Sequence, residues 1–130
     1  MFDFRQGDAL ESLMARFYES DRIVSTVCHG AAGLINVTMS NWKPLVKGKN
    51  VTGFSWPEEE AADRDDAVPF SLQDELRGAN YSTADKPFET YVLEDGPLIT
   101  GQNPGSARAV AKAVVKRLKP QPAEHTAGVA

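Results

Sequence analysis

The stretch 23–35 constrains this chain more than any other part of the sequence. It begins with β-branched and apolar residues, and this run ends abruptly in Cys28, His29 and Gly30. Small residues and an apolar segment of helical spacing follow. This order predicts a buried parallel strand, a very tight turn and a helix. Cys28 stands at the turn, where a side chain is placed for chemistry.

The surroundings of Cys28 leave two interpretations open. A single cysteine after an apolar strand is often an inert buried thiol. Cys28 is also a candidate nucleophile, because a helix N-terminus and a neighbouring imidazolium such as that of His29 both lower the pKa of a thiol. Backbone N–H groups of the small residues after the turn can stabilise an oxyanion, and Gly30 is the candidate donor.

The composition of the whole chain excludes several classes of protein. Its 130 residues suffice for one domain, and 42% hydrophobic and 25% charged residues are typical of a globular protein. A net charge of −4 disfavours nucleic acid and anionic membranes as partners. No apolar run is long enough to span a bilayer, and the first residues lack a signal-peptide pattern.

The cysteine and histidine content points in the same direction. One cysteine excludes an internal disulfide and is typical of a reducing compartment. The two histidines, His29 and His125, belong to no cluster with zinc-ligand spacing. We therefore expect a cytoplasmic protein without a metal.

The remaining pattern alternates helices and strands, as in an α/β fold. We expect helices over 8–20, about 33–39, from 57 onward, 70–76 and 104–118, and strands over 23–27, 51–55, 90–94 and 98–100. Asp95-Gly96 between the last two strands is a hairpin signal. Pro120 ends the last helix, so we expect a domain over 1–119 and a flexible tail over 120–130.

Three consecutive glutamates, Glu58 to Glu60, follow Pro57 at the start of a predicted helix. The helix dipole stabilises carboxylates at this end. The presence of any one of these glutamates is therefore explained by its position in the first turn of a helix, without a catalytic role. An acidic cluster together with a Cys-His pair nevertheless favours a reactive interpretation of Cys28.

Three motifs occur in a specific order: Val27-Cys28-His29-Gly30, then Gly48-Lys49-x-Val51-Thr52-Gly53-Phe54 with Glu58-Glu59-Glu60, then Asp95-Gly96-x-Leu98-Ile99-Thr100-Gly101-Gln102-Asn103-Pro104-x-Ser106-Ala107. Together they resemble the ThiJ/PfpI superfamily, which has the class I glutamine-amidotransferase-like fold. The similar branch is that of the glutathione-independent glyoxalases (glyoxalase III) and their chaperone-like relatives. The resemblance covers residues 1–118 and implies a flavodoxin-like α/β three-layer sandwich with a mainly parallel sheet.

Transferred to this sequence, the resemblance implies that Cys28 is the nucleophile and His29 the general base. Glu59 matches the acid that orients the histidine, because its spacing from Gly53-Phe54 favours it over the glutamates on either side. The implied reaction is the cofactor-free conversion of a small 2-oxoaldehyde such as methylglyoxal to a hydroxy acid. This is a lyase- or hydrolase-type detoxification typical of a stress response.

The sequence departs from that family in two ways. Ala31 stands where this branch often has proline, which alters the turn little. The resemblance also reaches only the C-terminal part of longer relatives, whose N-terminal region supplies sheet strands, a carboxylate near the cysteine and a glycine-rich turn. We expect a fold that is incomplete on its N-terminal side, with an open strand edge. This predicts a homo-oligomer, most simply a two-fold dimer, or a partner that supplies the missing half.

Three functions follow as hypotheses. The first is a glyoxalase- or hydrolase-like enzyme that uses Cys28, His29 and Glu59. The second is a truncated, non-enzymatic relative that acts as a chaperone-like or interaction module. The third, a glutamine amidotransferase, is disfavoured because that chemistry uses a His and a Glu close together late in the domain. The late histidine here, His125, lies in the expected tail.

Overall fold

A three-stranded mixed sheet forms the centre of the computed structural model, which describes residues 3–76 and 78–119. Strand β1 (Val24–Val27) runs parallel to β5 (Leu98–Gly101), and β4 (Val92–Asp95) runs antiparallel to β5 on its other side. The predicted hairpin is confirmed, and Gly96 supplies the positive φ of +59° that its tight turn requires. The strand order β1-β5-β4 leaves β1 at the edge of this sheet.

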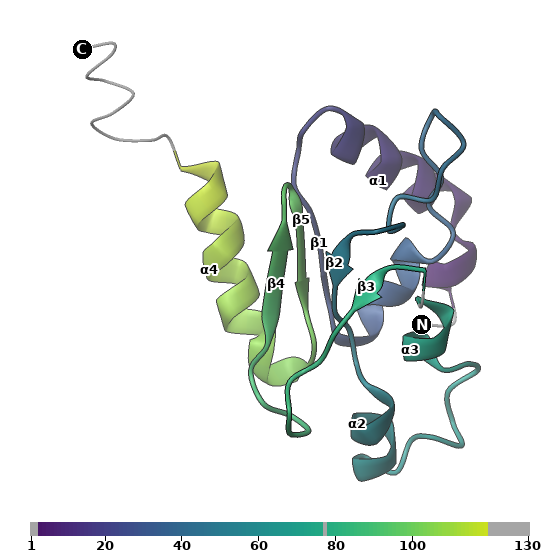
Figure 1. The fold of residues 1–130 in the computed structure, drawn as a ribbon, viewed down its shortest axis with the longest axis vertical. Helices are drawn as coiled ribbons and strands as arrows, with labels where there is room; N and C mark the ends of the chain where they lie inside the picture. The colour runs from purple at the N-terminus through teal and green to yellow at the C-terminus, as the bar shows by residue number, and fades with distance from the viewer. Residues whose placement is uncertain (1–2, 77, 120–130) are drawn as a thin grey trace.

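Helices cover both faces of the sheet (Figure 1). Helix α1 (Asp8–Glu19) packs against β1, and α4 (Ala107–Leu118) packs against β5 and β1 from the other side. The core between these layers is apolar, as their sequence periodicity predicts. The largest fully buried apolar side chains of the described residues are Leu34, Leu45, Leu72, Leu76, Leu98 and Ile99. The predicted three-layer α/β architecture is therefore confirmed.

A second, two-stranded sheet joins β2 (Asn50–Val51) to β3 (Asn80–Tyr81) in parallel. The sequence predicts a longer strand over 51–55, but its second half makes other contacts. The backbone N–H of Thr52 donates to Thr100 Oγ1 at 3.0 Å, which ties this segment to β5. The chain then enters α2 (Trp56–Ala61), close to the predicted start at Pro57.

The segment after Cys28 differs from the prediction of a helix over 33–39. A 3₁₀ helix, η2 (Cys28–Leu34), forms instead, and the chain turns away after it. Gly33 lies under α1, where an added Cβ atom would make an ordinary contact with Met14 Cε at 3.4 Å. Val37 is fully buried beyond the turn, so tertiary packing overrides the local helical pattern here.

The remaining elements are short. Helix α3 (Leu72–Glu75) occupies the centre of the predicted 70–76 helix, and the Ser71 side chain caps it. The 3₁₀ helices η1 (Phe4–Gln6) and η3 (Pro104–Ser106) precede α1 and α4. No helix within residues 3–76 or 78–119 has the length and apolar character needed to cross a bilayer. The predicted tail, 120–130, lies outside the described residues.

Gly101 at the end of β5 provides a test of this packing. A Cβ atom there would lie 2.5 Å from Val110 Cγ2 of α4 and 3.3 Å from Ser106 Cβ. Gly101→Ala should therefore lower the free energy of unfolding by roughly 1–3 kcal/mol, as overpacking of a dense core does. Thermal melting measured by circular dichroism checks this. Gly78→Ala is the control, because no heavy atom lies within 4 Å of the added methyl group, and it should melt close to the parent chain.

Candidate active site

Cys28 lies at a sharp junction between β1 and η2, as the sequence predicts. Its φ of +60° places an L-residue in the left-handed region, which is rare outside turns and functional sites. The strand before it is held by parallel pairing with β5, and the Phe54 backbone N–H donates to the Cys28 carbonyl at 3.3 Å. Because both sides of the junction are anchored, the side chain of Cys28 is held at the carboxyl end of the sheet.

The structure brings Cys28, His29 and Glu59 together. Cys28 Sγ lies 3.6 Å from His29 Nδ1, and His29 Nε2 lies 2.9 Å from Glu59 Oε2. The histidine side chain is one-third exposed, whereas the Glu59 side chain is 2% exposed. A buried carboxylate on one ring nitrogen and a thiol on the other is the arrangement that orients an imidazole for proton transfer.

The first turn of α2 explains why Glu59 faces His29. Ser55 and Glu58 form a capping box, in which the Ser55 N–H donates to Glu58 Oε1 at 3.0 Å and the Glu58 N–H donates to Ser55 Oγ at 3.3 Å. Pro57 occupies the first turn and preorganises its backbone. With Glu58 held back on the cap, the next side chain projects to the histidine and Glu60 is exposed.

Glu58 itself organises the surrounding loops, a role that the sequence analysis missed. It is fully buried and accepts hydrogen bonds from Phe88 N at 2.7 Å and Asn103 Nδ2 at 2.8 Å. Burial raises the pKa of its carboxyl, but hydrogen bonds from Ser55, Gln102, Asn103 and Phe88 outweigh this and hold that pKa below its usual value. The carboxylate therefore stays charged and joins three segments that are distant in sequence.

Two aromatic rings adjoin the histidine. The Phe54 ring lies 4.5 Å from the His29 ring, and Phe88 meets Phe54 edge-on at 5.8 Å. Phe88 also has a positive φ of +63°, held by its hydrogen bond to Glu58. The motif containing Phe54 was available in the sequence, but no local pattern around Phe88 indicates that it approaches this site.

The expectation of a lowered pKa at Cys28 is wrong for this structure. Burial raises the pKa of the Cys28 thiol to about 11, and the carboxylates of Glu58 and Glu59 act in the same direction. The hydrogen bond from the His29 backbone lowers it, but this effect is smaller. Burial is the largest of these effects, and it outweighs the hydrogen bond. At neutral pH the thiol is therefore protonated.

Gly30, the candidate oxyanion donor, lies in η2 beside a hollow of about 330 Å³ that Thr26, Val27 and Phe4 also line. The nearest atom to a Cβ added at Gly30 would be Phe4 Cε2, at 4.0 Å. Of the candidate site residues, Gly30 lines this hollow, whereas Cys28, His29 and Glu59 do not. Within residues 3–76 and 78–119, no three His, Cys, Asp or Glu side chains are grouped so that they could share a metal ion.

The fold and this site define a class: α/β proteins in which a strand of the sheet ends in a cysteine with a positive φ, next to a histidine. The sequence profile of the DJ-1/PfpI family matches residues 3–117, and the chain belongs to that family. The resemblance identified from the three motifs is confirmed.

Individual relatives support the same branch. The chain is 33% identical over 127 residues to a probable glutathione-independent glyoxalase, hsp3104, of Schizosaccharomyces pombe. Among solved structures, it is 40% identical to Rapid Encystment Protein of Francisella tularensis, with a TM-score of 0.86 over 91% of this chain. It is 28% identical to glyoxalase III of Candida albicans, with a TM-score of 0.82 over 91% of this chain.

The chain spans about half the length of the relatives it matches. The alignments cover 91% of this chain but 56% of the S. pombe protein, and 53% and 52% of the two solved structures. The activity of those whole proteins therefore enters below as a proposal.

The protonated thiol gives the first prediction about this site. Raising the pKa from 9.0 to about 11 lowers the thiolate fraction at pH 7.5 roughly 100-fold. A more basic thiolate is intrinsically more nucleophilic, by roughly tenfold for this change. Iodoacetamide should therefore label native Cys28 about tenfold more slowly than the urea-unfolded chain, with a rate that keeps rising above pH 9.

Mass spectrometry of samples quenched at successive times, between pH 6 and 10, measures the labelling rates of the native and the unfolded chain at this single cysteine. Equal rates for the folded and unfolded chains would contradict this account of the site, and a faster native rate would show that the thiolate is stabilised.

Proposed function

We propose that this chain carries the catalytic half of a cofactor-free, glyoxalase III-like enzyme that converts 2-oxoaldehydes such as methylglyoxal to hydroxy acids. One observation carries the proposal: the imidazole of His29 joins the Cys28 thiol to the buried Glu59 carboxylate. Relatives near 30% identity are known as glutathione-independent glyoxalases, which supports the same reaction class. Hydrolysis of a related carbonyl substrate would use the same residues.

The first step is addition of Cys28 to the aldehyde. Because the thiol is protonated at neutral pH, His29 takes its proton through Nδ1 as the sulfur attacks the aldehyde carbon. The carbonyl π electrons move to oxygen, which accepts a proton to give a hemithioacetal. Glu59 stabilises the imidazolium that forms, since its carboxylate lies on the opposite ring nitrogen. The Gly30 N–H is the proposed donor to the developing oxyanion.

The second step moves a proton between neighbouring carbons. Neutral His29 removes the proton from the former aldehyde carbon, and the electron pair forms an enediol with the adjacent carbonyl carbon. The former ketone oxygen takes up a proton as the enediol forms. Return of the abstracted proton to the adjacent carbon, with loss of the hydroxyl proton from the former aldehyde carbon, then gives a 2-hydroxyacyl thioester on Cys28. Water then attacks the thioester, releases the hydroxy acid and restores the thiol. The steps balance without an external oxidant or reductant, because one carbon is oxidised as its neighbour is reduced.

A second candidate is a non-enzymatic, chaperone-like or interaction module. The observation that favours it is exposed apolar surface: Leu118 is 69% exposed and Leu13 is 43% exposed. The high pKa of Cys28 favours it too, because a protonated thiol is a weaker nucleophile.

Turnover of methylglyoxal by the purified chain separates the two functions. We expect stoichiometric formation of lactate, measured by enzymatic assay or NMR, without added glutathione or metal. Cys28→Ser should abolish it, because a hydroxyl that His29 and Glu59 do not sufficiently activate is a poor nucleophile here. Ser40→Ala, at an exposed site on another surface, is the matched control and should retain full activity. If the folded parent chain forms no lactate, the enzymatic proposal is wrong and the non-enzymatic interaction module is the remaining candidate.

The two neighbouring glutamates should separate into different roles. Glu59→Gln should lower kcat at least tenfold, because an imidazole without a carboxylate partner is poorly oriented and its cation is less stabilised. Its melting temperature should change little, since glutamine fills the same volume.

Glu58→Gln should instead lower the melting temperature by several degrees, because it weakens a charged acceptor of four hydrogen bonds. The assignment is overturned if Glu58→Gln lowers kcat in a chain of parental stability while Glu59→Gln does not.

A further inference from the structure

Phe54 contacts two members of the candidate site at once. Its backbone N–H donates to the Cys28 carbonyl at 3.3 Å, and its ring lies 4.5 Å from the His29 ring. Phe54 is buried, with 4% of its surface exposed, and it lies between β2 and α2, outside both elements. The position of this one residue therefore affects both the backbone anchor of the proposed nucleophile and the orientation of the imidazole.

The Phe54 carbonyl is held by a side chain rather than by a backbone ladder. Phe54 lies outside the helices and strands, and no backbone N–H of the described residues donates to its carbonyl. The carbonyl of a buried residue needs a donor, because leaving it unpaired costs free energy. The Tyr81 hydroxyl donates to it at 3.2 Å. A side chain of β3 thus holds the backbone of the residue that contacts Cys28 and His29.

The backbone of Tyr81 is itself fixed on both sides. Tyr81 lies opposite Val51 in the parallel pair of β2 and β3. Before it, the Asn80 N–H donates to the Lys49 carbonyl at 2.8 Å. After it, the Ser82 N–H donates to the Val51 carbonyl at 3.1 Å. The ring therefore extends from a fixed strand toward the Phe54 carbonyl.

Two features keep the Tyr81 hydroxyl in place as a donor. Burial raises the pKa of the Tyr81 hydroxyl, and the carboxylate of Glu58 acts in the same direction, so the hydroxyl keeps its proton. Gly53 leaves space for it: an added Cβ atom there would lie 3.2 Å from the Tyr81 hydroxyl oxygen and 3.0 Å from Ala31 Cβ. The glycine before Phe54 thus permits the close approach of the hydroxyl.

We propose that Tyr81 is a positioning residue of the candidate active site and acts through Phe54 on Cys28 and His29. Its hydroxyl fixes the Phe54 carbonyl. The Phe54 N–H then holds the end of β1, and the Phe54 ring restricts the imidazole. This role rests on the proposed function, because the thiol and the imidazole that Tyr81 positions are the groups which that reaction uses.

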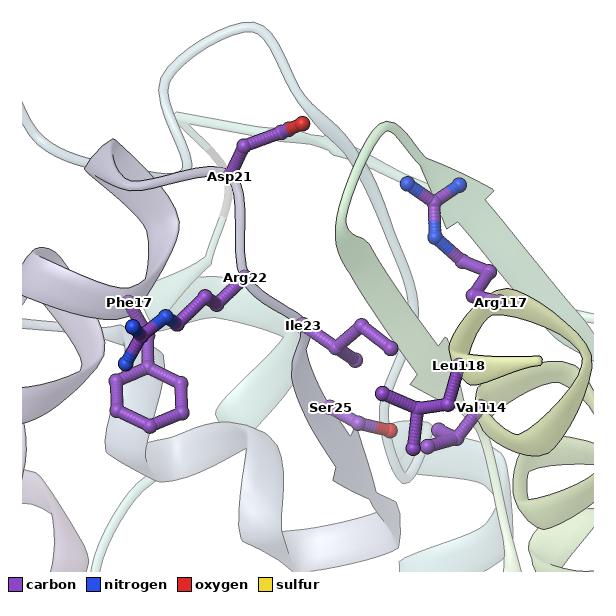
Figure 2. A pocket seen from close by; sticks show the side chains of 8 residues that line it. All are labelled: Phe17, Asp21, Arg22, Ile23, Ser25, Val114, Arg117 and Leu118. Carbon is purple, nitrogen blue, oxygen red and sulfur yellow. The ribbon is translucent and has the colours of Figure 1, made fainter. Parts of the chain in front are cut away.

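The contacts of Tyr81 and Phe54 are confined to the carboxyl end of β1. Figure 2 shows Ser25 and Leu118 in a hollow of about 700 Å³ beside the start of the same strand. Neither Phe54 nor Tyr81 lines this hollow. A change at Ser25 therefore alters the strand that carries Cys28 without touching these contacts.

Removal of the Tyr81 hydroxyl tests the role. In NMR spectra of the folded Tyr81→Phe chain, the His29 ring-proton resonances should move toward those of the unfolded chain. A displaced Phe54 ring exerts a weaker ring current on them, whereas loss of stability alone would leave them unchanged. The kcat for methylglyoxal should fall roughly tenfold, because a misplaced thiol and imidazole react slowly. KM should change less than about twofold, since the hydroxyl faces the Phe54 carbonyl rather than the substrate.

Two variants serve as controls. Tyr91→Phe removes another tyrosine hydroxyl, which forms a hydrogen bond with Ser82 Oγ at 2.9 Å. Ser25→Ala removes a hydroxyl from β1 at the hollow shown in Figure 2. Both variants should keep the parental His29 resonances and the parental kcat. Equal changes in Tyr91→Phe and Tyr81→Phe would show that the effect does not depend on the Phe54 carbonyl, and the proposal would be wrong.

The two measurements separate this proposal from the proposed function. Unchanged His29 resonances in folded Tyr81→Phe overturn the positioning role, whether or not the parent chain forms lactate. A parental kcat in that variant overturns it as well. If the resonances move as expected but the parent chain forms no lactate, the proposed function fails while the contact through Phe54 is supported. A Tyr81→Phe chain that does not fold would make the hydroxyl a requirement of the whole fold, which also contradicts a positioning role.

Discussion

The parallel pairing of β1 with β5 is the interaction on which the rest of this structure depends. Parallel strands end at the same edge of a sheet, so this pairing brings Cys28 and the Gln102–Asn103 turn to one place although they are distant in sequence. Helix α2 contacts both turns. Its Glu58 accepts a hydrogen bond from Asn103 of one turn, and its Glu59 pairs with His29 of the other. The candidate site is thus a consequence of strand direction rather than of any one motif.

Two adjacent carboxylates show how local geometry separates chemically identical side chains. Glu58 is turned back by the capping box into a buried set of donors, and Glu59 is consequently directed to the imidazole. A charged buried carboxylate is stable only when its hydrogen bonds replace water, and four donors meet that requirement at Glu58. Glu59 has the histidine on one oxygen, while its other oxygen is buried without a partner among the described residues.

The electrostatics of Cys28 give the proposed chemistry its particular form. A half-buried thiol beside two carboxylates stays protonated, so His29 must remove the proton during attack rather than before it. The thiol, the imidazole and the carboxylate then act as one proton-transfer unit. A positive charge near the thiol would lower its pKa and so change this balance.

The sequence by itself determined the α/β class, the β1–turn junction, the Asp95-Gly96 hairpin and the family, because these depend on local periodicity, turn chemistry and ordered motifs. Through the spacing of the family motif from Gly53-Phe54, it also indicated Glu59 as the partner of His29. Only the tertiary structure decided that the segment after Cys28 is a short 3₁₀ helix, that Phe88 approaches the site and that the thiol pKa is raised. Each of these depends on burial and on contacts between distant segments, which no local pattern encodes.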